Sequence, residues 1–295
     1  MKRDVTIVAA LVLCTACSHN AKFDATGSFE ATEVTVPARA AGTILSLKVE
    51  EGDTLSAGAL VGAVDSLQAY LACAALQENV KSVTAGRPQI EKQIAATREE
   101  IAKQKLEVSR VEKLLGSGAA TGKQWDDVNS TLKVLEGRLA AQLSTLHNTA
   151  SSIDAQASAL DLQRSEALDR LDKCRIVSPV SGTVLALYAR AGEWAAPGKP
   201  LFKVADLHHL FLRAYVTSKQ LASLKLGQQV TARAQFGGGA AREYKGVITW
   251  ISPESEFTPK NIQTADDRAD RVYAIKIAVE NDGYIKIGTY GEVLF

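Results

Sequence analysis

The chain of 295 residues carries 34 basic and 33 acidic side chains, and its net charge of +1 provides no basic field for binding nucleic acid. We therefore exclude nucleic acid as a partner. The length would hold about two compact domains, but roughly a third of the chain has the pattern of one long helical hairpin, so the rest must form small modules.

The N-terminal residues have the pattern of a targeting signal. Two basic residues precede the apolar run 5–13, which is too short to cross a bilayer and is typical of a secretory signal peptide. The small residues before Cys17 resemble a bacterial lipobox, in which the cysteine is acylated, although Cys14 stands where leucine is usual. We expect a signal over 1–17, lipidation of Cys17 and a linker over 18–27. An ordinary signal peptide is the alternative.

A leading strand at 28–36 and half of a small β domain are predicted over residues 28–66, where short alternating runs are punctuated by glycines. The same pattern returns after the helical region, in residues 175–205, at a shift of 140 positions. The identities pair Gly42, Thr43, Leu45, Leu47, Gly52, Gly58 and Val64 with Gly182, Thr183, Leu185, Leu187, Gly192, Gly198 and Val204. Neither half can bury one face alone, so the two halves should pack together as one flattened β-sandwich.

Between the halves, residues 67–174 have the heptad spacing of an antiparallel two-stranded coiled coil. The first arm places Ile90, Ile94, Thr97, Ile101, Gln104, Val108, Val111 and Leu115 in the seam. The second arm places Leu132, Leu135, Leu139, Gln142, Leu146, Thr149, Ile153, Gln156 and Leu160 there. The polar members Thr97, Gln104, Gln142 and Gln156 would fix the register. Gly86–Arg87–Pro88 should interrupt the first arm, with the helix restarting near Pro88, which would be its first residue.

Residues 206–295 contain several alternating runs and a predicted short helix over 218–226, which is typical of a small antiparallel β-barrel. The Pro-bounded segment 252–261 is predicted as a loop. The fold class is therefore an elongated multi-domain α+β protein: a split sandwich, a long helical hairpin and a barrel.

The order of these parts resembles the periplasmic adaptor family, also called HlyD-like membrane fusion proteins. The repeated halves are similar to those of the biotinyl/lipoyl domain, whose turn glycines correspond here to Gly42, Gly52, Gly182 and Gly192. Carriers of that type hold their cofactor on a lysine between the halves. The joining segment 64–69 has no lysine, so we expect no cofactor and disfavour a carrier protein.

The resemblance implies transport through the cell envelope and no enzymatic activity. An adaptor links an inner-membrane exporter to an outer-membrane channel and packs side by side in a ring, typically of six protomers. A lipid anchor at Cys17 would hold this chain in the envelope, with the inner membrane favoured. The segment 252–261 is similar to a loop of adaptors that serve ABC exporters, so an ABC permease is favoured over an RND pump. No complete membrane-proximal domain is expected after the barrel.

The Gly-rich turn of the hairpin carries the candidate docking site. Arg110, Leu114, Thr121 and Asp126 have spacings that resemble the Arg, Leu, Ser, Asp tip motif with which adaptors dock on outer-membrane channels, with threonine in place of serine. Thr121 and Gln124 also fit a helix capping box, so a purely structural role is the alternative.

The histidines and cysteines give little support for catalysis or metal binding. The histidines, including His208 and His209, have no cysteine or carboxylate at metal-ligand spacing, and no catalytic motif is present, so we expect no metal site. Cys73 and Cys174 both lie at the base of the hairpin. The sequence allows either a disulfide between them or two free thiols. A structural or adhesive cell-envelope lipoprotein with a coiled-coil stalk is the alternative function.

Overall fold

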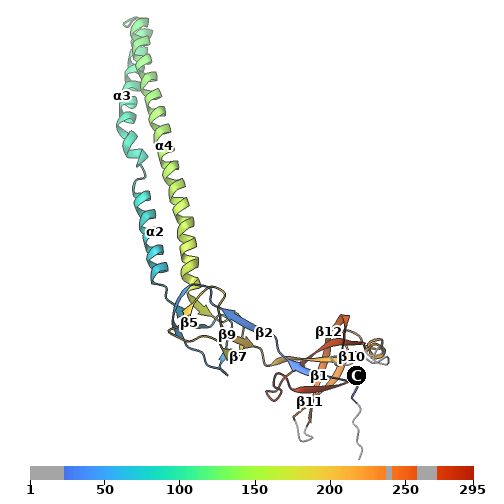
Figure 1. The fold of residues 1–295 in the computed structure, drawn as a ribbon. Coiled ribbons are helices and arrows are strands. Elements are labelled where there is room, and N and C mark those ends of the chain that lie inside the picture. The colour runs from blue at the N-terminus through green and yellow to red at the C-terminus, as the bar shows by residue number, and fades with distance from the viewer. Residues whose placement is uncertain (1–22, 237–240, 258–270) are drawn as a thin grey trace, which may run out of the picture.

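The computed structural model describes residues 23–236, 241–257 and 271–295. The molecule is elongated, with a helical hairpin rising from a β-sandwich and a β-barrel on the other side of the sandwich (Figure 1). The predicted fold class is confirmed. Cys17 and residues 258–261 of the predicted loop lie outside the described residues.

The sandwich consists of two four-stranded sheets, and each sheet takes strands from both halves of the repeat. One sheet has the order β2 (Glu33–Pro37), β9 (Pro200–Ala205), β7 (Gly182–Leu187), β4 (Thr54–Leu55). The other has the order β6 (Arg175–Val177), β5 (Leu60–Val64), β3 (Gly42–Leu47), β8 (Trp194–Ala195). Exchanging the two halves converts one order into the other, so the repeat is a structural pseudo-twofold.

Reciprocal backbone hydrogen bonds join the two halves. The amide of Gly52 donates to the carbonyl of Val184 at 2.9 Å, and the equivalent amide of Gly192 donates to the carbonyl of Ile44 at 2.8 Å. Both glycines have positive φ, +99° and +90°, which other residues adopt only with strain. These two turns therefore require glycine, and they place each half's turn against the other half's strand.

The hairpin is inserted between β5 and β6, which pair with each other in the sandwich. It consists of α2 (Leu67–Ala85), α3 (Ile90–Gly116) and the long α4 (Gly122–Lys173). The predicted break in the first arm is confirmed, because α2 ends at Ala85. Its detail differs from the prediction: the N-cap of α3 is Gln89, so Pro88 precedes the helix and does not occupy its first position.

Three of the four predicted polar seam residues bond across the hairpin. The hydroxyl of Thr97 donates to Gln142 Oε1 at 3.2 Å, and Gln142 Nε2 donates to the carbonyl of Gln93 at 3.0 Å. Gln104 Nε2 donates to the carbonyl of Val128 at 2.9 Å. Each bond satisfies a polar group in the seam and links opposite arms, as expected for residues that fix register.

Two predicted seam positions in the lower half of the second arm are wrong, whereas Ile153 and Leu160 are partly buried as predicted. Thr149 is exposed and Ala150 is buried in its place. Gln156 is also exposed and contacts Ser152 of its own helix, whereas Ala157 is partly buried. At these two positions the seam moves by one residue, and alanines occupy it where polar residues were expected.

The barrel is closed by six strands. Their order is β1 (Ala25–Glu30), β10 (His209–Thr217), β13 (Arg271–Glu280), β12 (Ala241–Phe257), β11 (Gln229–Gln235) and β14 (Tyr290–Leu294). The predicted leading strand 28–36 is thus two strands in different domains. β1 pairs with both β10 and β14 and so closes the barrel. Without β1, the other five strands would form an open sheet in which β10 and β14 have unpaired edges.

Two further boundaries in the barrel differ from the prediction. The short helix α5 covers only Ser218–Leu221, where Thr217 and Gln220 form a capping box. The predicted loop 252–261 begins inside β12, which continues to Phe257 beyond a register shift between Ile251 and Ser255. A β-bulge accommodates the proline there without ending the strand.

Candidate functional site

The turn of the hairpin lies at the end of the molecule farthest from the barrel (Figure 1). The end of α3 is closed by two backbone hydrogen bonds: the amide of Ala119 donates to the carbonyl of Leu114 at 2.8 Å, and that of Gly118 donates to Leu115 at 3.0 Å. With Gly118 at φ +75°, this is a Schellman motif. The last carbonyls of α3 are therefore satisfied by the turn itself.

The start of α4 is closed equally well. The amide of Gln124 donates to the hydroxyl oxygen of Thr121 at 3.3 Å, and the amide of Thr121 donates to Gln124 Oε1 at 2.8 Å. The predicted capping box is thus confirmed. Only Ala119 and Ala120 separate Gly118, in the motif that ends α3, from Thr121, the N-cap of α4. The tip is therefore a compact turn in which both helix ends are closed by hydrogen bonds of the turn itself.

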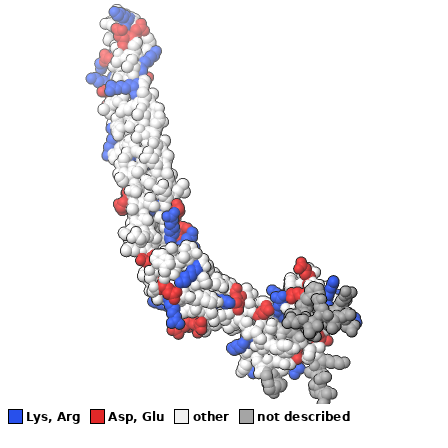
Figure 2. Space-filling view, viewed as in Figure 1, with Lys and Arg blue, Asp and Glu red and all other residues white. Residues whose placement is uncertain are grey.

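All four predicted tip residues are exposed. Arg110 and Leu114 are four residues apart on α3 and share a side of the helix, while Thr121 caps α4 and Asp126 lies in its second turn. The Arg110 guanidinium contacts Glu107 at 2.6 Å, yet its side chain remains 69% exposed, and Leu114 is 44% exposed. Charges of both signs gather at this end of the hairpin (Figure 2). The tip therefore presents charged, polar and apolar groups on a rigid turn.

The other predicted glycines, Gly42 and Gly182, mark close approaches of the backbone. A Cβ on Gly182 would lie 2.4 Å from the carbonyl oxygen of Ala205, and one on Gly42 would lie 2.8 Å from Val64 Cγ1. Each glycine begins a strand where it passes the end of another. Lack of space therefore favours glycine at both positions, and at Gly42 the φ of +153° adds a conformational reason.

The root of the hairpin takes the place of the turn that a carrier protein would modify. Asp65 Oδ1 accepts the amide of Leu67 at 3.0 Å as α2 begins. Cys73 and Cys174 are both buried and free, which decides the alternative left open above. Burial raises the pKa of Cys174, and the charge of Asp65 raises it further, so its thiol is a poor nucleophile.

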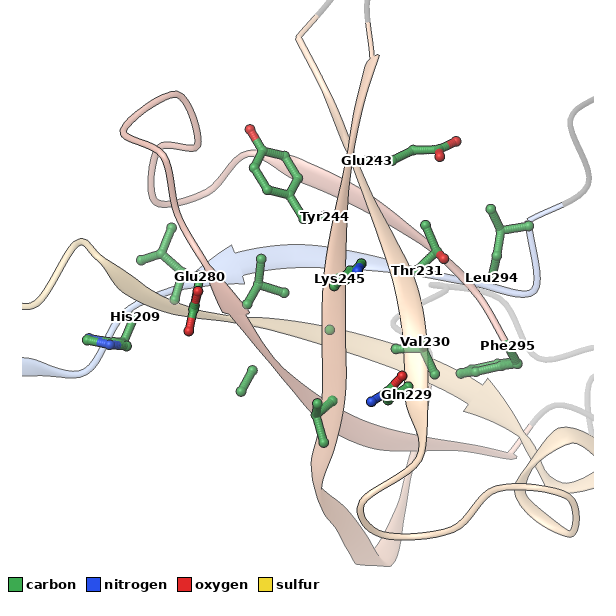
Figure 3. Close-up of a pocket in the computed structure, with 15 residues that line it drawn as sticks. His209, Gln229, Val230, Thr231, Glu243, Tyr244, Lys245, Glu280, Leu294 and Phe295 are labelled. Carbon is green, nitrogen blue, oxygen red and sulfur yellow. The ribbon is translucent and has the colours of Figure 1, made fainter.

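A hollow of about 980 Å³ lies on the barrel (Figure 3), at the opposite end of the molecule from the hairpin tip (Figure 1). It is lined by charged and apolar side chains together, among them His209, Lys245, Glu280 and Phe295. Within the described ranges, no three His, Cys, Asp or Glu side chains are placed to hold a metal ion.

One contact of this region was not predicted. His209 Nδ1 lies 2.7 Å from Asp206 Oδ2, so a carboxylate does stand beside one of the histidines, although this pair alone is not a metal-binding cluster. This hydrogen bond raises the pKa of His209 and lowers the pKa of Asp206. The Asp-x-x-His spacing at the start of a strand is the sequence feature from which this contact could have been predicted.

The family described as "RND MFP, barrel-sandwich hybrid domain" matches residues 32–207. The chain belongs to this family of membrane fusion proteins. Two relatives are the UPF0194 membrane proteins YE2891 of Yersinia enterocolitica and YbhG of Salmonella gallinarum. The first is 25% identical over 276 residues, covering 86% of this chain and 83% of the relative. The second is 27% identical over 277 residues, covering 86% and 82%.

Solved structures share the fold of this membrane fusion protein. MacA from Actinobacillus actinomycetemcomitans is 23% identical, with a TM-score of 0.54, and the match covers 91% of this chain and 76% of MacA. The membrane fusion protein Spr0693 from Streptococcus pneumoniae is 19% identical, with a TM-score of 0.52, covering 91% and 96%. The matching family is one of membrane fusion proteins, and the two structures show that the fold extends over most of this chain. Among the described helices, none is long and apolar enough to cross a bilayer.

Proposed function

We propose that this membrane fusion protein bridges an inner-membrane exporter and an outer-membrane channel in the periplasm. The observation that carries the proposal is the position of the hairpin between β5 and β6, with its tip and the barrel at opposite ends of the molecule. Such a shape separates two docking sites by a long spacer. A lipid anchor at Cys17 would hold the barrel end at the inner membrane.

The tip is the proposed contact with the channel. Both helix ends at the turn are capped by residues of the turn, and the exposed side chains of Arg110 and Leu114 take no part in those caps. Arg110, Leu114, Thr121 and Asp126 form the proposed docking set, in which the guanidinium and carboxylate can pair with polar groups of a partner and Leu114 can fill an apolar recess.

An ABC permease is the favoured exporter, on the resemblance of the segment 252–261 to a loop of adaptors that serve such exporters. An RND pump is the second candidate, and the description of the matching family supports it. Crosslinking in cells followed by identification of the co-purified inner-membrane protein distinguishes the two. Recovery of neither class would favour the adhesive stalk.

We further propose that protomers assemble side by side in a ring, with six as the number typical of such adaptors. The support is apolar surface on the outside of the hairpin that one chain leaves uncovered, including Leu106, Val134 and Leu162. Mass measurement of the assembled complex counts the protomers.

The docking proposal is tested by Arg110→Ala and Asp126→Ala in an export assay. Both changes are at exposed sites and should leave folding and membrane attachment intact while export is lost. Arg170→Ala is the matched control, because Arg170 also pairs with an acidic residue of its own helix, Glu166 at 2.6 Å, and its side chain is 71% exposed. Normal export in both tip variants would remove the tip from the mechanism.

A further inference from the structure

The N-terminal attachment places one end of the barrel close to the membrane. Cys17 is about seven residues from Asp24, and at about 3.5 Å per residue this stretch of chain reaches on the order of 25 Å at full extension. Asp24 directly precedes β1. Whichever way the molecule leans, the barrel end that contains Asp24 stays within that distance of the bilayer surface.

This end of the barrel is held together around Asp24. The amide of Asp24 donates to the carbonyl of Val293 at 2.8 Å, and its carboxylate accepts the amide of Phe295 at 2.9 Å. The side chain of Gln220, in α5, donates to the carbonyl of Asp24. The start of β1, the end of β14 and α5 therefore form one surface, opposite the end that joins the sandwich.

Apolar side chains project from this surface. Leu226, in the turn after α5, is 66% exposed, while Phe23 is 48% and Phe295 is 37% exposed. Exposed Lys219 and Lys225 lie in α5 and in the same turn. Among the described residues of this surface Asp24 is acidic, and its carboxylate accepts the backbone hydrogen bond from Phe295. Apolar side chains flanked by lysines are the composition of surfaces that bind the interface of anionic membranes.

We propose that this end of the barrel, formed by Phe23, Leu226 and Phe295 with Lys219 and Lys225, rests on the membrane surface and contacts anionic phospholipid. The short tether favours lipid over a protein partner, because it keeps the patch beside the bilayer at all times and leaves little depth for a folded domain between them. The contact orients the barrel, so the hairpin points away from the membrane. The inference rests on the proposed attachment at Cys17.

The test uses the full-length lipidated chain in vesicles of phosphatidylethanolamine and phosphatidylglycerol. An environment-sensitive fluorophore is attached to Leu226→Cys, and in a matched control to Leu162→Cys, which is 74% exposed on α4. The native Cys73 and Cys174 are buried, so their failure to label reports that the variant is folded. We expect a blue shift and quenching by headgroup-labelled nitroxide lipid at residue 226 and neither effect at residue 162. Lys219→Glu combined with Lys225→Glu should abolish both effects.

The outcomes separate the patch from the anchor. If the chain floats with the vesicles while the probe at residue 226 is as unquenched as the probe at 162, the patch is refuted and the anchor stands. If the chain does not float, both the attachment at Cys17 and the patch are refuted. Quenching that survives the double lysine variant would overturn the role of anionic lipid.

Discussion

The capping box at the hairpin tip allows a quantitative test of what Thr121 does. Replacing Thr121 with alanine removes the oxygen that accepts the Gln124 amide at 3.3 Å, and loss of an N-cap costs about 1 kcal/mol. That free energy corresponds to roughly a fivefold change in the local opening equilibrium. Because α4 is 52 residues long and packed along its length, we expect this change only in the first turn, without loss of the hairpin.

Hydrogen exchange followed by mass spectrometry measures the effect. The amides of Gln124 and Trp125, which both donate to Thr121, should exchange about fivefold faster in Thr121→Ala and at the wild-type rate in Thr121→Ser, which keeps the hydroxyl. Gln124→Ala opens the other half of the box and should fray the turn similarly. If export falls in Thr121→Ala but not in Gln124→Ala, the hydroxyl itself contributes to docking. Unchanged exchange in Thr121→Ala would refute the capping argument.

Three further predictions concern the rest of the molecule. Ile94→Ala, at a fully buried seam position, should lower the stability of the hairpin by about 2–5 kcal/mol in thermal unfolding, whereas Thr149→Ala should have little effect. Gly182→Ala should prevent the sandwich from closing, seen as loss of soluble folded protein, because its Cβ would clash with a backbone carbonyl. Asp206 raises the pKa of His209 in the folded protein. The hydrogen bond between them should therefore contribute fully to stability below the ordinary pKa of histidine, and this contribution should decline as the pH rises through the raised pKa of His209. Asp206→Asn should return the pKa of His209, measured by NMR, towards its ordinary value.

The internal repeat made most of the sandwich predictable from sequence. Identities such as Gly52 with Gly192 correspond to reciprocal hydrogen bonds of the pseudo-twofold, so a sequence shift of 140 positions has a direct structural meaning. The sequence did not reveal that each sheet would combine strands of both halves. That arrangement depends on which edges pair, and edge pairing is a tertiary property that the alternation of one strand does not encode.

The leading strand was misassigned for a related reason. Residues 28–36 alternate almost continuously, and nothing local marks the two residues at which the chain passes from the barrel into the sandwich. Phe29 is fully buried in the barrel core, while Val36 is buried in the sandwich core. Periodicity predicts a strand but not its sheet, and only closure of the barrel by β1 decides between them.

The phase change in α4 and the break in the first arm belong together. Two ion pairs keep one register from α3 into the break: Lys105 pairs with Glu136 at 3.0 Å, and Arg87, within the break, pairs with Asp154 at 3.0 Å. The first arm between Lys105 and Arg87 therefore advances by as many residues as α4 between Glu136 and Asp154. The buried Ala150 lies close to Asp154, so α4 shifts its seam where it faces backbone that is not helical. A four-residue insertion into a heptad pattern locally unwinds a coiled coil. Because the first arm is interrupted here, its helices do not have to change their winding together with α4. The interruption at Pro88 thus lies where the seam of α4 moves by one residue, and it allows the two arms to keep their register across that change.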